Sequence, residues 1–194
     1  TALLNGDLQI GLWLGLATAN SSELCGHARF DWLVIDGEHT PSDLPILTAQ
    51  MQALEASPSN AVVRVPIGET WIIKQVLDAG AQTVLVPMVE DAEQARELVK
   101  AMRYPPEGVR GVGSALARAS KYNTITDYLT TANDQVCLLV QVESANAMSN
   151  IETIADHKHY TGDLREHAHW GHENRINQAV SDAGRPGEQD RRDG

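Results

Sequence analysis

Short apolar runs alternate along this chain with longer segments in which apolar residues recur every three or four positions. The apolar runs predict strands at 10–14, 32–35, 61–65, 83–87 and 136–140. The intervening segments predict helices after Ser21-Ser22, from Pro41-Ser42-Asp43 through Leu54, around 72–77, at 91–103, and through Ile151 and Ile154. Successive early strands begin roughly 20 to 30 residues apart, which is the spacing of βα units in a parallel sheet.

Polar residues follow the ends of several predicted strands. Asp36, Glu38 and His39 come after the second strand, Arg64 lies in the last part of the third, and Glu143 follows the fifth. In a (β/α)8 barrel all these ends face one mouth, where the active site lies. A doubly wound sheet would gather polar residues mainly at one crevice. We therefore predict an α/β fold of the (β/α)8 TIM-barrel type.

The composition changes at residue 157. The segment 157–194 contains five of the seven histidines and no apolar run of strand length. We predict barrel units carrying most of the active site at 1–156, and an atypical polar, His-rich tail at 157–194. Because a complete barrel needs about 250 residues, the C-terminal units are expected to be incomplete or altered in this chain.

Charge and hydropathy exclude some classes of partner. A net charge of −11 argues against binding to nucleic acid. No apolar run approaches the roughly 20 residues that span a bilayer, and the first residues do not resemble a signal peptide. Cys25 and Cys137 lie in apolar segments, as expected of buried reduced thiols. These features predict a cytoplasmic protein without a membrane partner.

Two positions could carry proton transfer and anion binding. His39 follows Asp36 by three residues, and a carboxylate beside an imidazole fixes its tautomer and raises its basicity. Alternatively, Asp36 caps a turn and His39 is merely solvated. Arg64 interrupts an apolar strand, so it is expected to clamp a substrate carboxylate or to form a structural ion pair with Asp36 or Asp78.

Three further segments could bind ligands. Gln141 and Glu143 share one face of the fifth strand, and Glu143 is a plausible ligand for a hard cation or a partner of a helix N-terminus. The Gly/Pro-rich segment 103–113 is interpreted as a substrate-covering loop. The tail histidines could bind zinc, or belong to a polar segment without a core; they are His157, His159, His167, His169 and His172.

Several stretches together resemble the HpcH/HpaI aldolase family over residues 1 to about 156. They are Gln9–Leu16, Phe30–His39, Pro87–Val89, Arg103–Pro106 with Arg110–Ser120, and Val140–Ser144. The resemblance implies a class II aldolase that needs a divalent cation (Mg, Mn or Co), with Glu143 as one metal ligand. It implies that Arg64 holds the keto-acid end, and that His39, oriented by Asp36, takes the proton of the C4 hydroxyl, directly or through a metal-bound water. Asp78 and Gln141 match further polar positions of the family's site, Asp78 as a catalytic residue and Gln141 as a substrate-binding residue.

The implied reaction is cleavage of 4-hydroxy-2-oxoheptanedioate to pyruvate and succinic semialdehyde in aromatic compound degradation. Alternatives are a sugar-acid aldolase acting on 2-keto-3-deoxyglucarate, and an inert truncated remnant. The resemblance also implies a homo-hexamer built as a trimer of dimers. The family's second metal ligand is an aspartate after a sixth strand. Such a strand is not evident here, and Asp163 is the only weak candidate.

Overall fold

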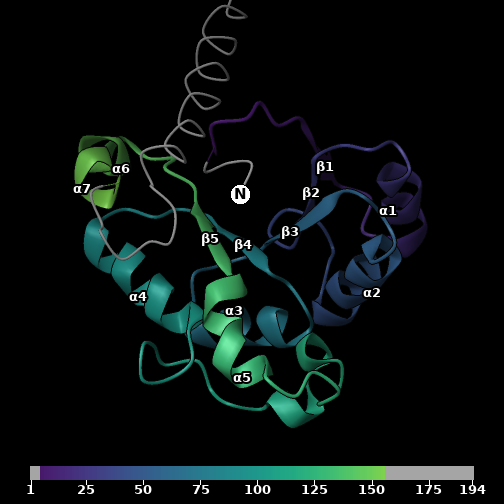
Figure 1. The fold of residues 1–194 in the computed structure, drawn as a ribbon. Helices are drawn as coiled ribbons and strands as arrows, with labels where there is room; N and C mark the ends of the chain where they lie inside the picture. Colours follow the sequence, from purple (N-terminus) through teal and green to yellow (C-terminus); the bar gives the residue numbers. More distant parts are fainter. Residues whose placement is uncertain (1–4, 156–194) are drawn as a thin grey trace, which may run out of the picture.

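The computed structural model describes residues 5–155, which form a five-stranded parallel sheet whose strands alternate with helices (Figure 1). The strands are β1 (Gly11–Leu14), β2 (Trp32–Asp36), β3 (Asn60–Arg64), β4 (Thr83–Val86) and β5 (Cys137–Val140). The main helices are α1 (Ala19–Gly26), α2 (Leu44–Leu54), α3 (Thr70–Asp78), α4 (Ala92–Met102), α6 (Ala145–Ser149) and α7 (Ile151–Ala155). Between α4 and β5 lie η2 (Ser114–Leu116), η3 (Arg118–Ser120), α5 (Tyr128–Thr131) and η4 (Ala132–Gln135).

The strands follow one another in the order β1-β2-β3-β4-β5, and every neighbouring pair is parallel. A doubly wound sheet reverses its strand order at a switch point, whereas a barrel adds each strand on the same side of the last. The observed order is that of a barrel wall, and it confirms the predicted α/β barrel class.

The two faces of the sheet differ in what covers them. The larger core lies between the sheet and the helices, where Leu33, Ile35, Val63, Val84 and Val140 meet the apolar sides of the helices. A smaller cluster of Val34, Val62, Leu85 and Leu139 occupies the opposite face, together with Trp13, Trp32 and Cys137. Because side chains alternate along a strand, this second face is the inner wall of the barrel.

Two predicted helices differ from those in the structure. The first begins at Ala19 rather than after Ser21-Ser22, because the Thr18 side chain caps it by accepting the backbone N–H of Ser21 at 3.2 Å. The last is two short helices, α6 and α7. In the part of the chain that is described, no helix is long and apolar enough to cross a membrane.

The excursion, residues 103–136, lies at the amino-terminal ends of the strands. Its Arg118 donates to the carbonyl of Ala79, just after α3, and the N–H of Cys137 at its end bonds to Gln82, just before β4. In Figure 1 the excursion, with α5, is at the opposite end of the sheet from α6. Segment 103–113 therefore lies at the end of the barrel opposite the mouth of its own chain. The interpretation of it as a loop that covers the substrate of the same chain is wrong. A segment that connects a helix to the next strand must lie at the face opposite the strands' carboxyl ends.

Candidate active site

The strand register places polar residues in one layer above the inner apolar cluster. Val34 pairs with Val62, and two residues further along Asp36 pairs with Arg64. Leu85 pairs with Leu139, and two residues after Leu139 the chain reaches Gln141. Since residues two apart share a face, Asp36, Arg64 and Gln141 all point to the inner side at the mouth. Glu143 stands two residues after Gln141, further towards the mouth.

Arg64 is the centre of this layer, with only 8% of its side chain exposed. Its Nε and NH2 atoms donate to the two carboxylate oxygens of Asp36 at 2.9 and 2.7 Å, a bidentate pair. Its NH1 atom lies 2.6 Å from Oε2 of Glu38 and donates to Oε1 of Gln141 at 3.4 Å. Of the two acids predicted as ion-pair partners of Arg64, Asp36 is the one in contact.

Trp13 on β1 contacts both members of the Arg64–Asp36 pair. The guanidinium carbon of Arg64 lies 4.8 Å from the centroid of the Trp13 ring, and the indole N–H donates to Oδ2 of Asp36 at 3.3 Å. A cation over an aromatic face and a second donor to the same carboxylate both hold the pair in one orientation. Sequence reasoning did not identify Trp13 as a site residue. Its position one residue before the end of the predicted first strand was the available signal.

The backbone after β2 is folded tightly against β3. The N–H of Gly37 bonds to the carbonyl of Arg64 at 2.8 Å, and a Cβ at residue 37 would lie 2.6 Å from that oxygen. A side chain at this position would therefore separate the two strand ends. Gly37 thus allows the turn that brings Glu38 back to Arg64.

Asp36 is held ionised by its neighbours. Burial of the carboxyl opposes ionisation, but the hydrogen bond from Arg64, the N–H of Glu38, the positive charge of Arg64 and the N–H of His39 together lower the pKa of Asp36. The N–H groups of Glu38 and His39 lie 2.9 and 3.3 Å from Oδ1. The carboxylate is therefore a fixed anion that orients Arg64.

Because the pKa of Asp36 is lower in the folded chain, its ionised form stabilises the fold above the ordinary pKa of an aspartate, and this stabilisation is lost as the pH falls through the lowered value. We expect chemical denaturation to give a free energy of unfolding that decreases below about pH 4. The acid limb should flatten in Asp36→Asn relative to wild type. A slope unchanged by the substitution would show that other carboxyls cause it.

His39 is arranged differently from the prediction. Its side chain is 73% exposed, and its Nε2 atom lies 3.6 Å from Oε2 of Glu38. Asp36 contacts only the backbone N–H of His39, because both Asp36 oxygens are already directed to Arg64. The expectation that Asp36 orients the imidazole is therefore corrected. Glu38, for which sequence reasoning predicted no separate role, is the carboxylate that lies beside the ring.

Gln141 links the arginine to Glu143. The Gln141 amide accepts from Arg64 and its Nε2 lies 3.4 Å from Oε1 of Glu143, while Oε2 of Glu143 accepts the backbone N–H of Met88 at 3.0 Å. Glu143 is exposed at the mouth, so its oxygens are oriented but still accessible. Such a carboxylate fits a hard divalent cation as one ligand of a site completed by further oxygens. Among residues 5–155, no group of three or more His, Cys, Asp or Glu side chains could hold a metal by itself.

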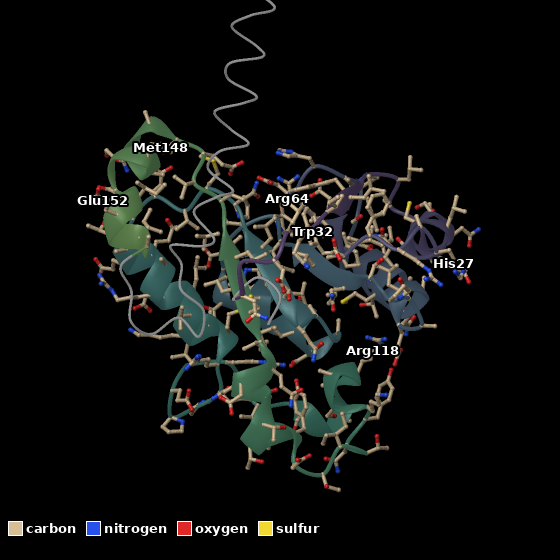
Figure 2. The ribbon with its side chains drawn as sticks, turned by 45° about the horizontal axis from the view of Figure 1, so that its top comes forward. His27, Trp32, Arg64, Arg118, Met148 and Glu152 are labelled. Carbon is tan, nitrogen blue, oxygen red and sulfur yellow. The ribbon has the colours of Figure 1, made fainter. Side chains whose placement is uncertain are left out.

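Asp78 lies away from these residues, at the C-terminal end of α3. The prediction that it shares the mouth with the other site residues of the same chain is therefore corrected. Its Oδ1 accepts a hydrogen bond from NH2 of Arg110 in the excursion at 2.6 Å. Arg110 is 1% exposed and stacks 4.3 Å from the centroid of the Tyr104 ring. Burial raises the pKa of Tyr104 to about 12, so its phenol stays neutral beside the cation. Figure 2 shows Arg64 at the mouth and Arg118, also of the excursion, at the other end of the sheet.

The remaining predictions for the site concern the tail. Asp163, the weak candidate for a second metal ligand, and the tail histidines lie outside the described residues. The boundary between residues 156 and 157 stays a prediction for the same reason.

Known proteins resemble this chain in sequence and in structure. It is 61% identical over 154 residues to a hydroxypyruvate/pyruvate aldolase of Deinococcus radiodurans, covering 79% of this chain and 56% of that protein. It is 57% identical over 155 residues to a 4-hydroxy-2-oxo-heptane-1,7-dioate aldolase of Shigella sonnei, covering 80% of this chain and 59% of that protein. The chain thus spans less than two thirds of the length of these curated relatives.

A solved structure supports the same assignment. The crystal structure of an HpcH/HpaI aldolase/citrate lyase family protein from Burkholderia cenocepacia matches with a TM-score of 0.79 and 37% identity, covering 93% of this chain and 76% of that one. The model of the HpcH/HpaI aldolase/citrate lyase family matches residues 9–162. The parallel barrel wall, the polar layer at its mouth and these likenesses agree, and the chain belongs to the HpcH/HpaI aldolase/citrate lyase family.

Proposed function

We propose that the protein is a divalent-metal-dependent aldolase that cleaves a 4-hydroxy-2-oxo acid into pyruvate and an aldehyde. The observation that carries this proposal is the continuous set of contacts from Glu38 through Arg64 and Gln141 to Glu143 at one mouth. It places a buried guanidinium beside an exposed carboxylate, with an exposed imidazole at the other side of the arginine. Anion binding, cation binding and proton transfer are thus available around one space.

Each group suits one requirement of retro-aldol cleavage. Breaking the C3–C4 bond needs a base at the C4 hydroxyl and a sink for the charge that develops on the 2-oxo oxygen. A divalent cation, when bound, supplies Lewis-acid polarisation of that oxygen. Glu143 would hold the cation as one ligand, Arg64 would bind the keto-acid end and offset the developing charge, and Gln141 would orient the substrate. His39 is exposed at the mouth and would accept the hydroxyl proton.

The proposed substrate is 4-hydroxy-2-oxoheptanedioate, which would give pyruvate and succinic semialdehyde. A relative named for this substrate is 57% identical, but a hydroxypyruvate/pyruvate aldolase is 61% identical. The second candidate is therefore an aldolase that uses hydroxypyruvate as well as pyruvate as the keto-acid partner. 2-Keto-3-deoxyglucarate is a third candidate substrate to assay. The proposed assembly is a homo-hexamer, to be measured by light scattering.

Pyruvate release, measured with a coupled lactate dehydrogenase assay, tests the proposal. We expect release from 4-hydroxy-2-oxoheptanedioate with Mn²⁺, Mg²⁺ or Co²⁺, little after chelation, and recovery when the metal is returned. The reverse reaction, with succinic semialdehyde and either pyruvate or hydroxypyruvate, discriminates the first two candidates. No pyruvate from 4-hydroxy-2-oxoheptanedioate or 2-keto-3-deoxyglucarate, and no aldol addition of pyruvate or hydroxypyruvate to succinic semialdehyde, at saturating metal would mean an inert remnant.

Glu143→Gln should weaken metal binding, because an amide oxygen carries no net charge with which to bind a cation. We expect the concentration of Mn²⁺ for half-maximal activity to rise about tenfold or more, a range expected of a lost ligand. The control is Glu97→Gln on the exposed side of α4, which removes the same charge far from the mouth. Equal metal dependence in the two variants would remove Glu143 from the proposed site.

A further inference from the structure

We propose that Glu38 is a displaceable partner of Arg64 that passes to His39 when a 2-oxo acid binds. The inference rests on the proposed function and assigns a positioning role to a residue that has none in it. Its basis is a single oxygen: Oε2 of Glu38 lies 2.6 Å from NH1 of Arg64 and 3.6 Å from Nε2 of His39. One carboxylate oxygen is thus shared by the anion clamp and the proton acceptor.

The contacts of Arg64 with its two carboxylates differ in hydrogen-bond geometry. Asp36 receives two aligned hydrogen bonds and further donors from Trp13 and the backbone. Oε2 of Glu38 is buried beside NH1 but accepts no hydrogen bond of normal geometry. Its contact with the arginine is therefore a close charge pair without alignment, and it costs less to exchange than the bidentate pair with Asp36.

A substrate oxygen that binds NH1 of Arg64 would compete with the partners that NH1 already has. The Nε atom and NH2 are directed to Asp36, and NH1 is directed to Glu38 and Gln141. Because the side chain is only 8% exposed, an incoming carboxylate or keto oxygen reaches it most directly at NH1, on the side towards Gln141 and Glu143. The aligned Asp36 pair stays in place, and the substrate oxygen replaces Glu38.

The released carboxylate lies beside another donor. Without NH1, the charge of Glu38, whose side chain is 17% exposed, needs a new partner, and the His39 imidazole already lies 3.6 Å from its Oε2. A carboxylate beside the imidazole would offset the positive charge that develops on His39 as it takes the C4 hydroxyl proton. The proton moves from the substrate oxygen to the imidazole, and the C3–C4 electron pair moves towards the 2-oxo group. This order of contacts would bring the Glu38 carboxylate to His39 only once the keto acid is bound.

Glu38→Gln tests this handover, because glutamine keeps the size of the side chain and removes its charge. Without a competing anion at NH1, we expect pyruvate to bind about three- to tenfold more tightly, in line with the extra strength of charge-assisted hydrogen bonds. Without a charged partner for His39, we expect kcat to fall about tenfold or more. A tighter complex that turns over more slowly is a combination that simple loss of structure does not produce.

Binding is measured by calorimetric titration of pyruvate in the presence of Mn²⁺, and kcat by pyruvate release, for wild type, Glu38→Gln and the control Glu97→Gln. The control is expected to match wild type. Equal or weaker pyruvate binding in Glu38→Gln would overturn the displacement, and unchanged kcat would overturn the transfer to His39. Tighter pyruvate binding in Glu38→Gln, with no turnover of any substrate by wild type, would reject the proposed function while supporting the exchange. Absence of pyruvate binding to both proteins would overturn both.

Discussion

Arg64→Lys is expected to lower kcat/KM for pyruvate release by about 10²- to 10³-fold, the range found when a preorganised donor to developing charge is removed. Lysine retains the charge but cannot reach Asp36 with two parallel hydrogen bonds while also contacting Gln141. Its ammonium would also lose the guanidinium's planar approach to the Trp13 ring. Steady-state kinetics with saturating Mn²⁺ would measure the loss. Arg96→Lys on the exposed side of α4 is the matched control.

The same position should be important for stability. Arg64→Met removes the cation and leaves Asp36 and Glu38 as close, poorly solvated anions, with 5% and 17% of their side chains exposed. Breaking a buried pair in this way costs about 3–5 kcal/mol. Urea denaturation should show this fall in the free energy of unfolding for Arg64→Met, and a smaller fall for Arg64→Lys. Activity near that of wild type in Arg64→Lys would contradict the clamp, even if the stability results agreed.

Asp78→Asn is expected to destabilise the fold by about 3–5 kcal/mol, because it removes the carboxylate that compensates a fully buried guanidinium. Only 1% of the Arg110 side chain is exposed, so water cannot replace the lost carboxylate. Its other close contacts in the described part of the chain are the Tyr104 ring and the Tyr128 hydroxyl. Loss of the pair would loosen the excursion from α3. Thermal unfolding and the susceptibility of 103–136 to proteolysis would measure both effects.

Glu55→Gln provides the comparison for Asp78→Asn. Glu55 pairs with Arg118 of the same excursion at 2.7 Å, but its side chain is 58% exposed, so we expect a change below about 1 kcal/mol. The Asp78 result also separates two roles for that residue. A fall in kcat with unchanged stability would favour the catalytic role implied by the family resemblance. Lower stability, with normal kcat in the remaining folded protein, would favour an anchor.

The fold class and the main site residues could be predicted from sequence because the signals were local. Apolar runs and helical spacing predicted all five strands, and a polar residue at a strand end indicated which face of the barrel it serves. Asp36, Arg64 and Gln141 could be found in this way, since each stands two residues after an inward apolar residue.

The errors concern contacts that depend on distant parts of the chain. Asp78 and the segment 103–113 carried motif signals, but a motif does not say which end of the barrel it reaches. The helix-to-strand connection decides that, and it places them at the amino-terminal ends. The choice between Asp36 and Glu38 as the imidazole's neighbour was also beyond the sequence. It depends on Arg64, which takes both Asp36 oxygens from another strand.

The position of the excursion separates two kinds of evolutionary change. Since 103–136 contacts the outer helix α3 and the strand beginnings, substitutions in it that preserve its buried contacts, such as the Asp78–Arg110 pair, should have little effect on the chemistry at the opposite rim. Relatives could therefore diverge in heat tolerance through this segment while keeping one reaction. Conversely, Leu16, Ile67 and Met88 follow the carboxyl ends of β1, β3 and β4 and are exposed, so changes there would alter the surface of the mouth without weakening the barrel wall.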